Sequence, residues 1–136
     1  MKSKTIRNYF ERSDESRKRA LEFDGAVAEM EKLTPGMYQM IRFNETEVSF
    51  EVTDISLEDA YDLCGTVKSI LESSLNINNI RWERVDFPTY KNVDFLTRPN
   101  NFLIRISTVP SDCTFVVDHY EKRPIYKMEC GGANES

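Results

Sequence analysis

The side chains in this sequence that could do chemistry are few, and the single histidine is the first to consider. His119 follows Asp118, a pairing in which a carboxylate could orient a catalytic base. The surrounding pattern predicts a strand, and neighbouring strand residues point to opposite faces. A thiol nucleophile at Cys113 would lie about 20 Å from His119 along such a strand, at ~3.3 Å per residue. We therefore expect His119 to be a hydrogen-bonded residue at a strand end and not a catalytic base.

The three cysteines, Cys64, Cys113 and Cys130, are widely spaced and form no Cys-x-x-Cys pair. Cys64 falls on the apolar side of a predicted helix, which is typical of a small core residue. The first residues carry positive charge but no apolar run like that of a secretory signal. We therefore expect a cytoplasmic protein whose cysteines are free thiols. With one histidine and scattered cysteines, we expect no zinc site.

Motifs that bind cofactors are missing from the sequence. It contains five glycines and no Gly-x-Gly-x-x-Gly, Gly-x-x-x-x-Gly-Lys-Ser/Thr or Gly-x-Ser-x-Gly pattern. We expect no cofactor and no metal, and a non-catalytic function is favoured. The alternative is a small enzyme with a cleft between sheet and helices, because carboxylates brought together only by folding leave no motif.

The charges are unevenly distributed along a chain whose net charge is −5. Residues 1–20 hold seven basic and three acidic side chains, whereas residues 21–75 hold three basic and twelve acidic ones. Residues 76–136 hold eight of each. The sequence thus has a basic head, an acidic middle segment and a balanced remainder.

The acidic middle segment predicts a surface that attracts a protein partner with basic side chains. Its likeliest contributors stand on the polar sides of a predicted hairpin and a predicted helix: Glu47, Glu51, Glu58, Asp59 and Asp62. Some phage-encoded inhibitors or modulators are small acidic α+β proteins that occupy a host protein's nucleic-acid site. That comparison rests on size and charge alone, and no protein family is recognised.

A nucleic-acid binder is the other alternative, and two sets of residues favour it. The basic head interleaves cations with Tyr9 and Phe10, and could contact phosphates; its cations are Lys2, Lys4, Arg7, Arg12, Arg17, Lys18 and Arg19. Predicted strands alternate arginines with aromatic residues on which bases could stack; these are Arg81, Trp82, Arg84, Arg98, Phe102 and Arg105. The chain is acidic overall and has no RNP1-like Lys/Arg-Gly-Phe run, so this interpretation is less favoured.

The element that must organise these residues is a helix predicted over Ser56–Leu75. Ser56 can cap its first turn, with Asp59 at the capping-box position. At about 100° per residue, its apolar residues share one half of the helical wheel; they are Leu57, Ala60, Leu63, Cys64, Val67, Ile70, Leu71 and Leu75. So wide an apolar side predicts packing on a sheet, against Val48, Phe50 and Val52. No apolar run is long enough to cross a membrane.

A second helix is predicted from Ser13 or Asp14 to Leu33, after a basic segment over residues 1–12 that permits a short helix. The apolar spacing also allows one long helix over residues 5–33 with a heptad-like pattern. Packing on the sheet is the favoured interpretation of this helix. Homodimerisation is the alternative, and Phe23, Val27 and Met30 would then lie at the contact.

The remaining segments predict strands. Met37–Phe43 and Glu47–Thr53 alternate as a hairpin around Asn44-Glu45-Thr46, and Ile80–Phe87 reads as a strand ending at Pro88. We also predict a second hairpin, formed by Phe102–Thr108 and Cys113–Tyr120, and an edge strand over Pro124–Cys130. The expected fold is α+β: two amphipathic helices on an antiparallel or mixed sheet of about five strands, in the order α-β-β-α-β-β-β. Residues 13–130 would form the single domain and residues 131–136 a flexible tail.

Overall fold

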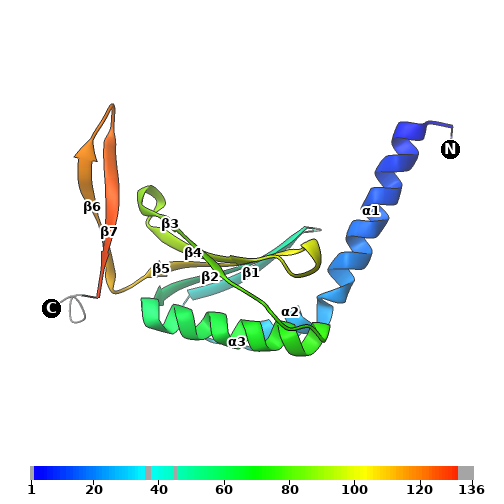
Figure 1. The fold of residues 1–136 in the computed structure, drawn as a ribbon, viewed down its shortest axis with the longest axis horizontal. Coiled ribbons are helices and arrows are strands. Elements are labelled where there is room, and N and C mark those ends of the chain that lie inside the picture. The colour runs from blue at the N-terminus through cyan, green and yellow to red at the C-terminus, as the bar shows by residue number, and fades with distance from the viewer. Residues whose placement is uncertain (1, 36–37, 45, 132–136) are drawn as a thin grey trace.

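The computed structural model describes residues 2–35, 38–44 and 46–131 (Figure 1). It has an α+β fold with a five-stranded sheet and a separate two-stranded sheet. Its elements in chain order are α1 (Lys4–Glu22), α2 (Asp24–Met30), β1 (Tyr38–Asn44), β2 (Glu47–Ile55), α3 (Leu57–Leu75), β3 (Glu83–Phe87), η1 (Pro88–Tyr90), β4 (Asn92–Thr97), η2 (Pro99–Asn101), β5 (Leu103–Pro110), β6 (Cys113–Tyr120) and β7 (Pro124–Cys130). The predicted tail, apart from Gly131, lies outside the described residues.

The five-stranded sheet has the order β1-β2-β5-β4-β3, in which only β2 and β5 run parallel. The first hairpin, β1–β2, is confirmed, although Glu45 in its turn is outside the described residues. The second predicted hairpin is wrong, because β5 pairs with β2 and β4 while β6 pairs with β7. The reason is burial: Ile104 and Ile106 of β5 are completely buried, which a central strand achieves and an isolated hairpin does not.

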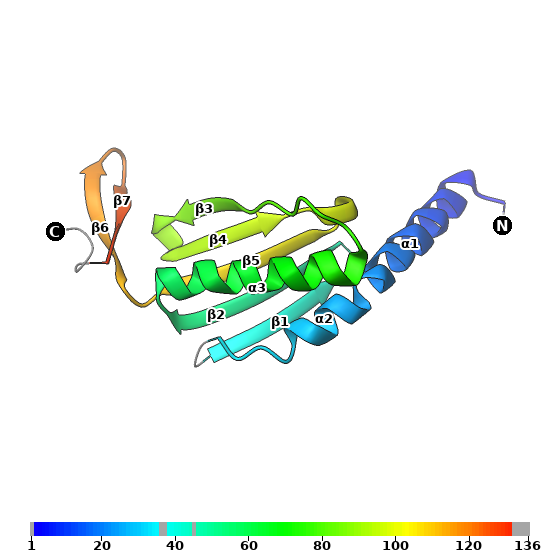
Figure 2. The same cartoon turned by 60° about the horizontal axis from the view of Figure 1, so that its bottom comes forward.

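Helix α3 covers one face of this sheet, with α2 beside it (Figure 2). Its N-terminus is capped by the Ser56 hydroxyl, which accepts a hydrogen bond from the Asp59 backbone N–H, and its C-terminal cap, Asn76, is left-handed. The predicted core is confirmed: Ala60, Cys64, Val67 and Leu71 are buried, as are Val48, Phe50 and Val52 on β2. Leu57 is only partly buried.

The N-terminal helices differ from both predictions, because the break falls at Phe23 and not near residue 13. Phe23 is completely buried and its ring stacks on Phe102 with 4.5 Å between ring centroids. Its backbone N–H donates to the Ala20 carbonyl, which closes the last turn of α1. Burial of this side chain turns the chain into α2, which packs beside α3, while α1 leaves the body of the protein (Figures 1 and 2).

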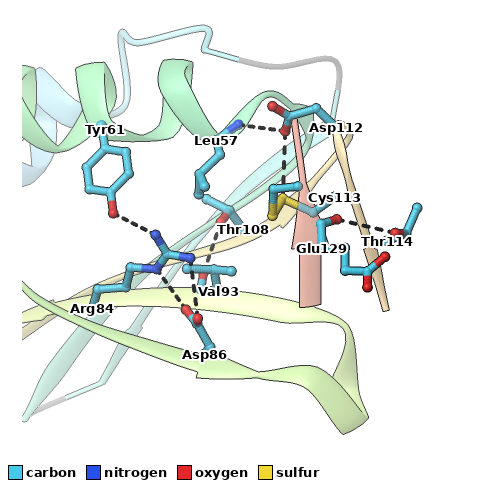
Figure 3. Close-up of a disulfide and its surroundings, with 11 residues drawn as sticks. Leu57, Tyr61, Arg84, Asp86, Val93, Thr108, Asp112, Cys113, Thr114 and Glu129 are labelled. Carbon is cyan, nitrogen blue, oxygen red and sulfur yellow. Dashed lines mark hydrogen bonds and ion pairs between the residues drawn. A yellow bond between two sulfur atoms is a disulfide. The ribbon is translucent and has the colours of Figure 1, made fainter. Parts of the chain in front are cut away.

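The β6–β7 hairpin carries a disulfide between Cys113 and Cys130, so the prediction of free thiols was wrong for these two residues. They oppose each other across the antiparallel pair, which brings together cysteines 17 residues apart in sequence. Just before the hairpin, the Asp112 carboxylate accepts from the Leu57 backbone N–H at 2.9 Å (Figure 3). That bond fastens the base of the hairpin to the first turn of α3.

Cys64 alone is a free thiol, and it is buried. Burial raises the pKa of the Cys64 thiol to about 12, because the thiolate would lose its solvation. The expectation of a small core residue is therefore confirmed for Cys64.

Truncating Leu71 should destabilise the protein by about 2–5 kcal/mol, through lost burial and a cavity between α3 and the sheet. The measurement is denaturant unfolding of Leu71→Ala, compared with Ser73→Ala on the exposed side of the same helix. Ser73→Ala should stay within about 0.5 kcal/mol of the parent. A Leu71→Ala cost no larger than that of the control would contradict the packing described above.

Thiol titration should distinguish the free cysteine from the two that are disulfide-bonded. The native protein should react slowly or not at all, and the unfolded, unreduced protein should show one thiol, that of Cys64. Reduction before unfolding should raise the count to three. Three thiols without any reductant would show that Cys113 and Cys130 are not bonded in solution.

Candidate functional site

No described helix or strand covers the face of the sheet opposite α3, and this uncovered face is the candidate site. Along each strand the apolar residues alternate toward the helices, which leaves the polar residues on the other face. Figure 1 shows α1 and the β6–β7 hairpin extending to this same side, at the two ends of the molecule's long axis. The uncovered face therefore lies between two projecting elements, α1 and the β6–β7 hairpin.

The centre of this face is built around Asp94 on β4, which is 3% exposed. Its carboxylate accepts hydrogen bonds from Asn92 Nδ2 at 2.7 Å, Ser107 Oγ at 2.7 Å and Arg105 Nη1 at 3.1 Å. The register places them together, since Asp94 lies directly opposite Ser107 and the other two residues stand two positions away on the same strands. These three donors compensate for burying the charge and hold Arg105 in place.

Around this cluster lies a hollow of about 490 Å³, lined by polar residues of β1, β2, β4 and β5 and by Phe43 of β1. Two ion pairs border it: Arg105 Nε lies 3.4 Å from Glu47 Oε1, and Arg42 Nε lies 3.3 Å from Glu51 Oε2. The Arg105 Nε atom is buried, and among the described residues no protein group accepts a hydrogen bond from it. The Glu47 carboxylate is the electrostatic partner of this nitrogen.

The predicted acidic surface is divided between the two sides of the sheet. Glu47 and Glu51 line the hollow, whereas Glu58, Asp59 and Asp62 lie exposed on α3, which packs on the opposite face. The five carboxylates therefore do not form one continuous surface. The physical reason is that hairpin and helix turn their apolar sides toward each other, so their polar sides must point in opposite directions.

The predicted arginine and aromatic surface is also not formed. Phe102 is completely buried, and Trp82 donates from Nε1 to the Cys64 carbonyl at 3.0 Å. Arg84 lies on the helical side, where it donates to Tyr61 Oη at 2.7 Å and to the Asp86 carboxylate at 2.8 Å (Figure 3). Only Arg105 of this set lines the hollow.

The residues predicted for self-association are mostly inside the body of the protein. Phe23 and Met30 are completely buried in the core of the same chain, so they are not available for a contact between folded copies. Val27 is partly buried and lines a groove at the base of α1. Packing within one chain therefore explains the heptad-like spacing from Ala20 to Met30.

His119 and Asp118 do contact each other, which the strand pattern excluded. Asp118 has no partner in the ladder, because the pairing shifts between Val117 and His119, and this bulge turns neighbouring side chains to the same side. His119 Nδ1 lies 2.8 Å from Asp118 Oδ2, and Nε2 lies 3.5 Å from a Glu121 carboxylate oxygen. The imidazole is half exposed on the hairpin, and Cys113 is held in the disulfide.

The sequence does not predict the central cluster, because the pattern of residues 89–97, which contain β4, is ambiguous between a strand and a loop. A signal was present: Asn92 and Asp94 alternate with apolar residues, as do Arg105 and Ser107. Alternation shows that such residues share a face but not which strands are neighbours. Within the described residues, no three His, Cys, Asp or Glu side chains are grouped to hold a metal, and no helix is long and apolar enough to span a bilayer.

Comparisons with known proteins give no relative: no family model matches the chain, and neither the characterised proteins nor the solved structures searched contain a significant match. A function must therefore be inferred from the uncovered face itself.

The hydrogen bond that the His119 ring donates to the Asp118 carboxylate raises the pKa of His119 above its usual 6.5, with a second contribution from Glu121. These contacts stabilise the folded protein fully at pH values below the pKa of histidine in the unfolded chain. Their contribution is lost as the pH rises through the higher pKa of folded His119. NMR titration of the folded protein should show this elevated pKa, and Asp118→Asn should lower it. An unchanged histidine pKa in that variant would contradict the contact.

Proposed function

We propose that the protein is a non-catalytic interaction protein that binds a protein partner with basic side chains on the uncovered face of the sheet. The observation that carries this proposal is the charged hollow at the centre of that face. In the described part of the chain α2 and α3 pack on one face of the sheet, and α1 and the β6–β7 hairpin project at its two ends. The other face is therefore accessible to a macromolecule.

The charges of the hollow favour a basic partner. Glu47 and Glu51 are only partly shielded, and their ion pairs with Arg105 and Arg42 have N–O distances of 3.4 and 3.3 Å. The exposed Arg42–Glu51 pair contributes about 0–1 kcal/mol, so a partner's cation can replace Arg42 at small cost. Arg105 stays held by Asp94, and a partner's cation would join it beside Glu47. Asp94 differs, because its buried carboxylate already has three donors. We assign it a supporting role beneath the binding surface.

The dimensions of the face also favour a macromolecule. Four strand spacings of ~4.8 Å give a width of about 19 Å, and strands of this length extend about 17–30 Å. The resulting area of roughly 300–600 Å² is below the ~800 Å² that each partner contributes to a typical stable interface. A partner of standard size would therefore also contact the projecting hairpin or α1.

The alternative of a small enzyme has less support. An acid or base in the hollow would need lone pairs free to exchange protons, and the Asp94 oxygens are taken by Asn92, Ser107 and Arg105. His119, the one histidine of the chain, stands on the hairpin and does not line the hollow. We accordingly expect His119→Gln to leave partner binding unchanged.

Reversing two charges tests the proposal. Glu47→Lys combined with Glu51→Lys should slow association with the partner on the order of tenfold at low salt, because long-range attraction becomes repulsion. The partner is obtained by affinity capture from the source cell and mass spectrometry. Association rates are then measured at low and moderate salt, where screening over about 10 Å at 0.1 M should slow the parent protein.

The matched control makes the same change on the other side of the sheet. Glu58→Lys combined with Asp62→Lys alters charge equally but lies on α3, so association should remain within about twofold of the parent. Thermal melting of both variants verifies that the fold is intact. An association rate that changes neither with salt nor with the Glu47/Glu51 charge reversal would refute the proposal. Direct binding of DNA or RNA that is lost on replacing Arg17, Lys18 and Arg19 would establish the nucleic-acid alternative instead.

A further inference from the structure

Helix α1 presents an apolar side that nothing in the described chain covers. The helix is 19 residues long, about 28 Å, and Ala20 is its only buried residue. Near its free end Ile6, Tyr9 and Phe10 are 50%, 63% and 50% exposed. At 100° per residue these three share one side of the helix with Ala20 and Leu21. In proteins most of a helix's stability comes from packing of its apolar side, so a partner that covers this side would stabilise α1.

At the base of α1 this apolar side continues into a groove of about 510 Å³. Leu21 of α1, Val27 of α2 and Phe43 of β1 supply most of its apolar surface, and Leu21 and Phe43 are 72% and 56% exposed. Its charged lining residues are two carboxylates, Asp24 and Glu31, and one cation, Arg17. The same surface thus holds a projecting apolar cluster at one end and an apolar depression at the other.

We propose that a second copy of this chain covers both: two α1 helices pack antiparallel, and the Ile6–Phe10 end of each enters the groove of the other. A two-fold axis joins such self-complementary surfaces, because the projection and the depression lie on one side of one helix. When Phe10 is set opposite Leu21, the axis passes between Glu15 and Ser16. Ser13 and Ser16 then lie near the middle of the contact, where small side chains let the helices approach closely.

Charge complementarity favours this arrangement over a parallel one. The N-terminal end of α1 carries Arg7 at the edge of its apolar side, and the groove carries Asp24 and Glu31. In the antiparallel alignment Arg7 falls opposite Asp24 of the second copy, and the helix dipoles oppose each other favourably. A parallel pair would bring the basic ends together and leave both grooves unfilled.

Sedimentation of the full chain at micromolar concentration tests the dimer. The parent protein should sediment as a dimer of 15.9-kDa chains, and Phe10→Ser should shift it to monomer. Because Phe10 is outside the core, this variant should keep the parent's secondary structure in the sheet and α3. Glu15→Ser, on the opposite side of α1, is the matched control and should stay dimeric. A parent protein that remains monomeric throughout this range would overturn the proposal.

Cysteine cross-linking determines the direction of the pair. A mixture of Phe10→Cys and Leu21→Cys proteins should form a covalent dimer under mild oxidation, whereas neither variant should do so alone. These positions lie about 16 Å apart on one helix, too far for a bond within a chain. Buried Cys64 and the bonded Cys113 and Cys130 give little background. Cross-linking of Phe10→Cys protein to itself, without the mixed product, would indicate a parallel pair and refute the antiparallel contact. Dimerisation is tested at Phe10 and Leu21 and partner binding at Glu47 and Glu51, so either proposal can fail alone.

Discussion

The structure depends on burial of one face of the five-stranded sheet beneath α2 and α3. Val48, Phe50 and Val52 of β2 and Ile104 and Ile106 of β5 supply its centre, and all five are completely buried. Because strand side chains alternate, filling this face with apolar residues sends every intervening residue to the other face. The charged hollow therefore lies on the face opposite the core, and shifting a strand's register by one residue would move its apolar side chains to the polar face.

The parallel pairing of β2 with β5 determines which charges meet on the uncovered face. It sets Ser49 beside Arg105, so Glu47 lies close enough to pair with the same guanidinium. These strands are separated in sequence by α3, β3 and β4, and only the return of the chain to the middle of the sheet makes them neighbours. Asp94 then joins from β4, and its burial is tolerated because the assembled strands supply its donors.

The break at Phe23 has a comparable effect on the N-terminal region. A continuous helix would carry α2 away from the body, whereas insertion of Phe23 against Phe102 lets α2 cover the sheet beside α3. The cost is that α1 is exposed along most of its length, with only Ala20 buried. One buried ring thus creates both the exposed apolar side of α1 and the groove at its base, which are the two halves of the proposed dimer contact.

The sequence by itself determined the elements whose patterns are local. The Ser56 cap and the apolar periodicity of α3, the β1–β2 hairpin and the α+β class all follow from residues close together in the chain. Only the tertiary structure decided which strands are neighbours, that Cys113 meets Cys130, and that Glu47 and Asp62 lie on opposite sides. The bulge that joins Asp118 to His119 is likewise a property of pairing with β7. Periodicity specifies which side of an element is buried, but the partner is chosen by the burial available to the whole chain, which no local pattern contains.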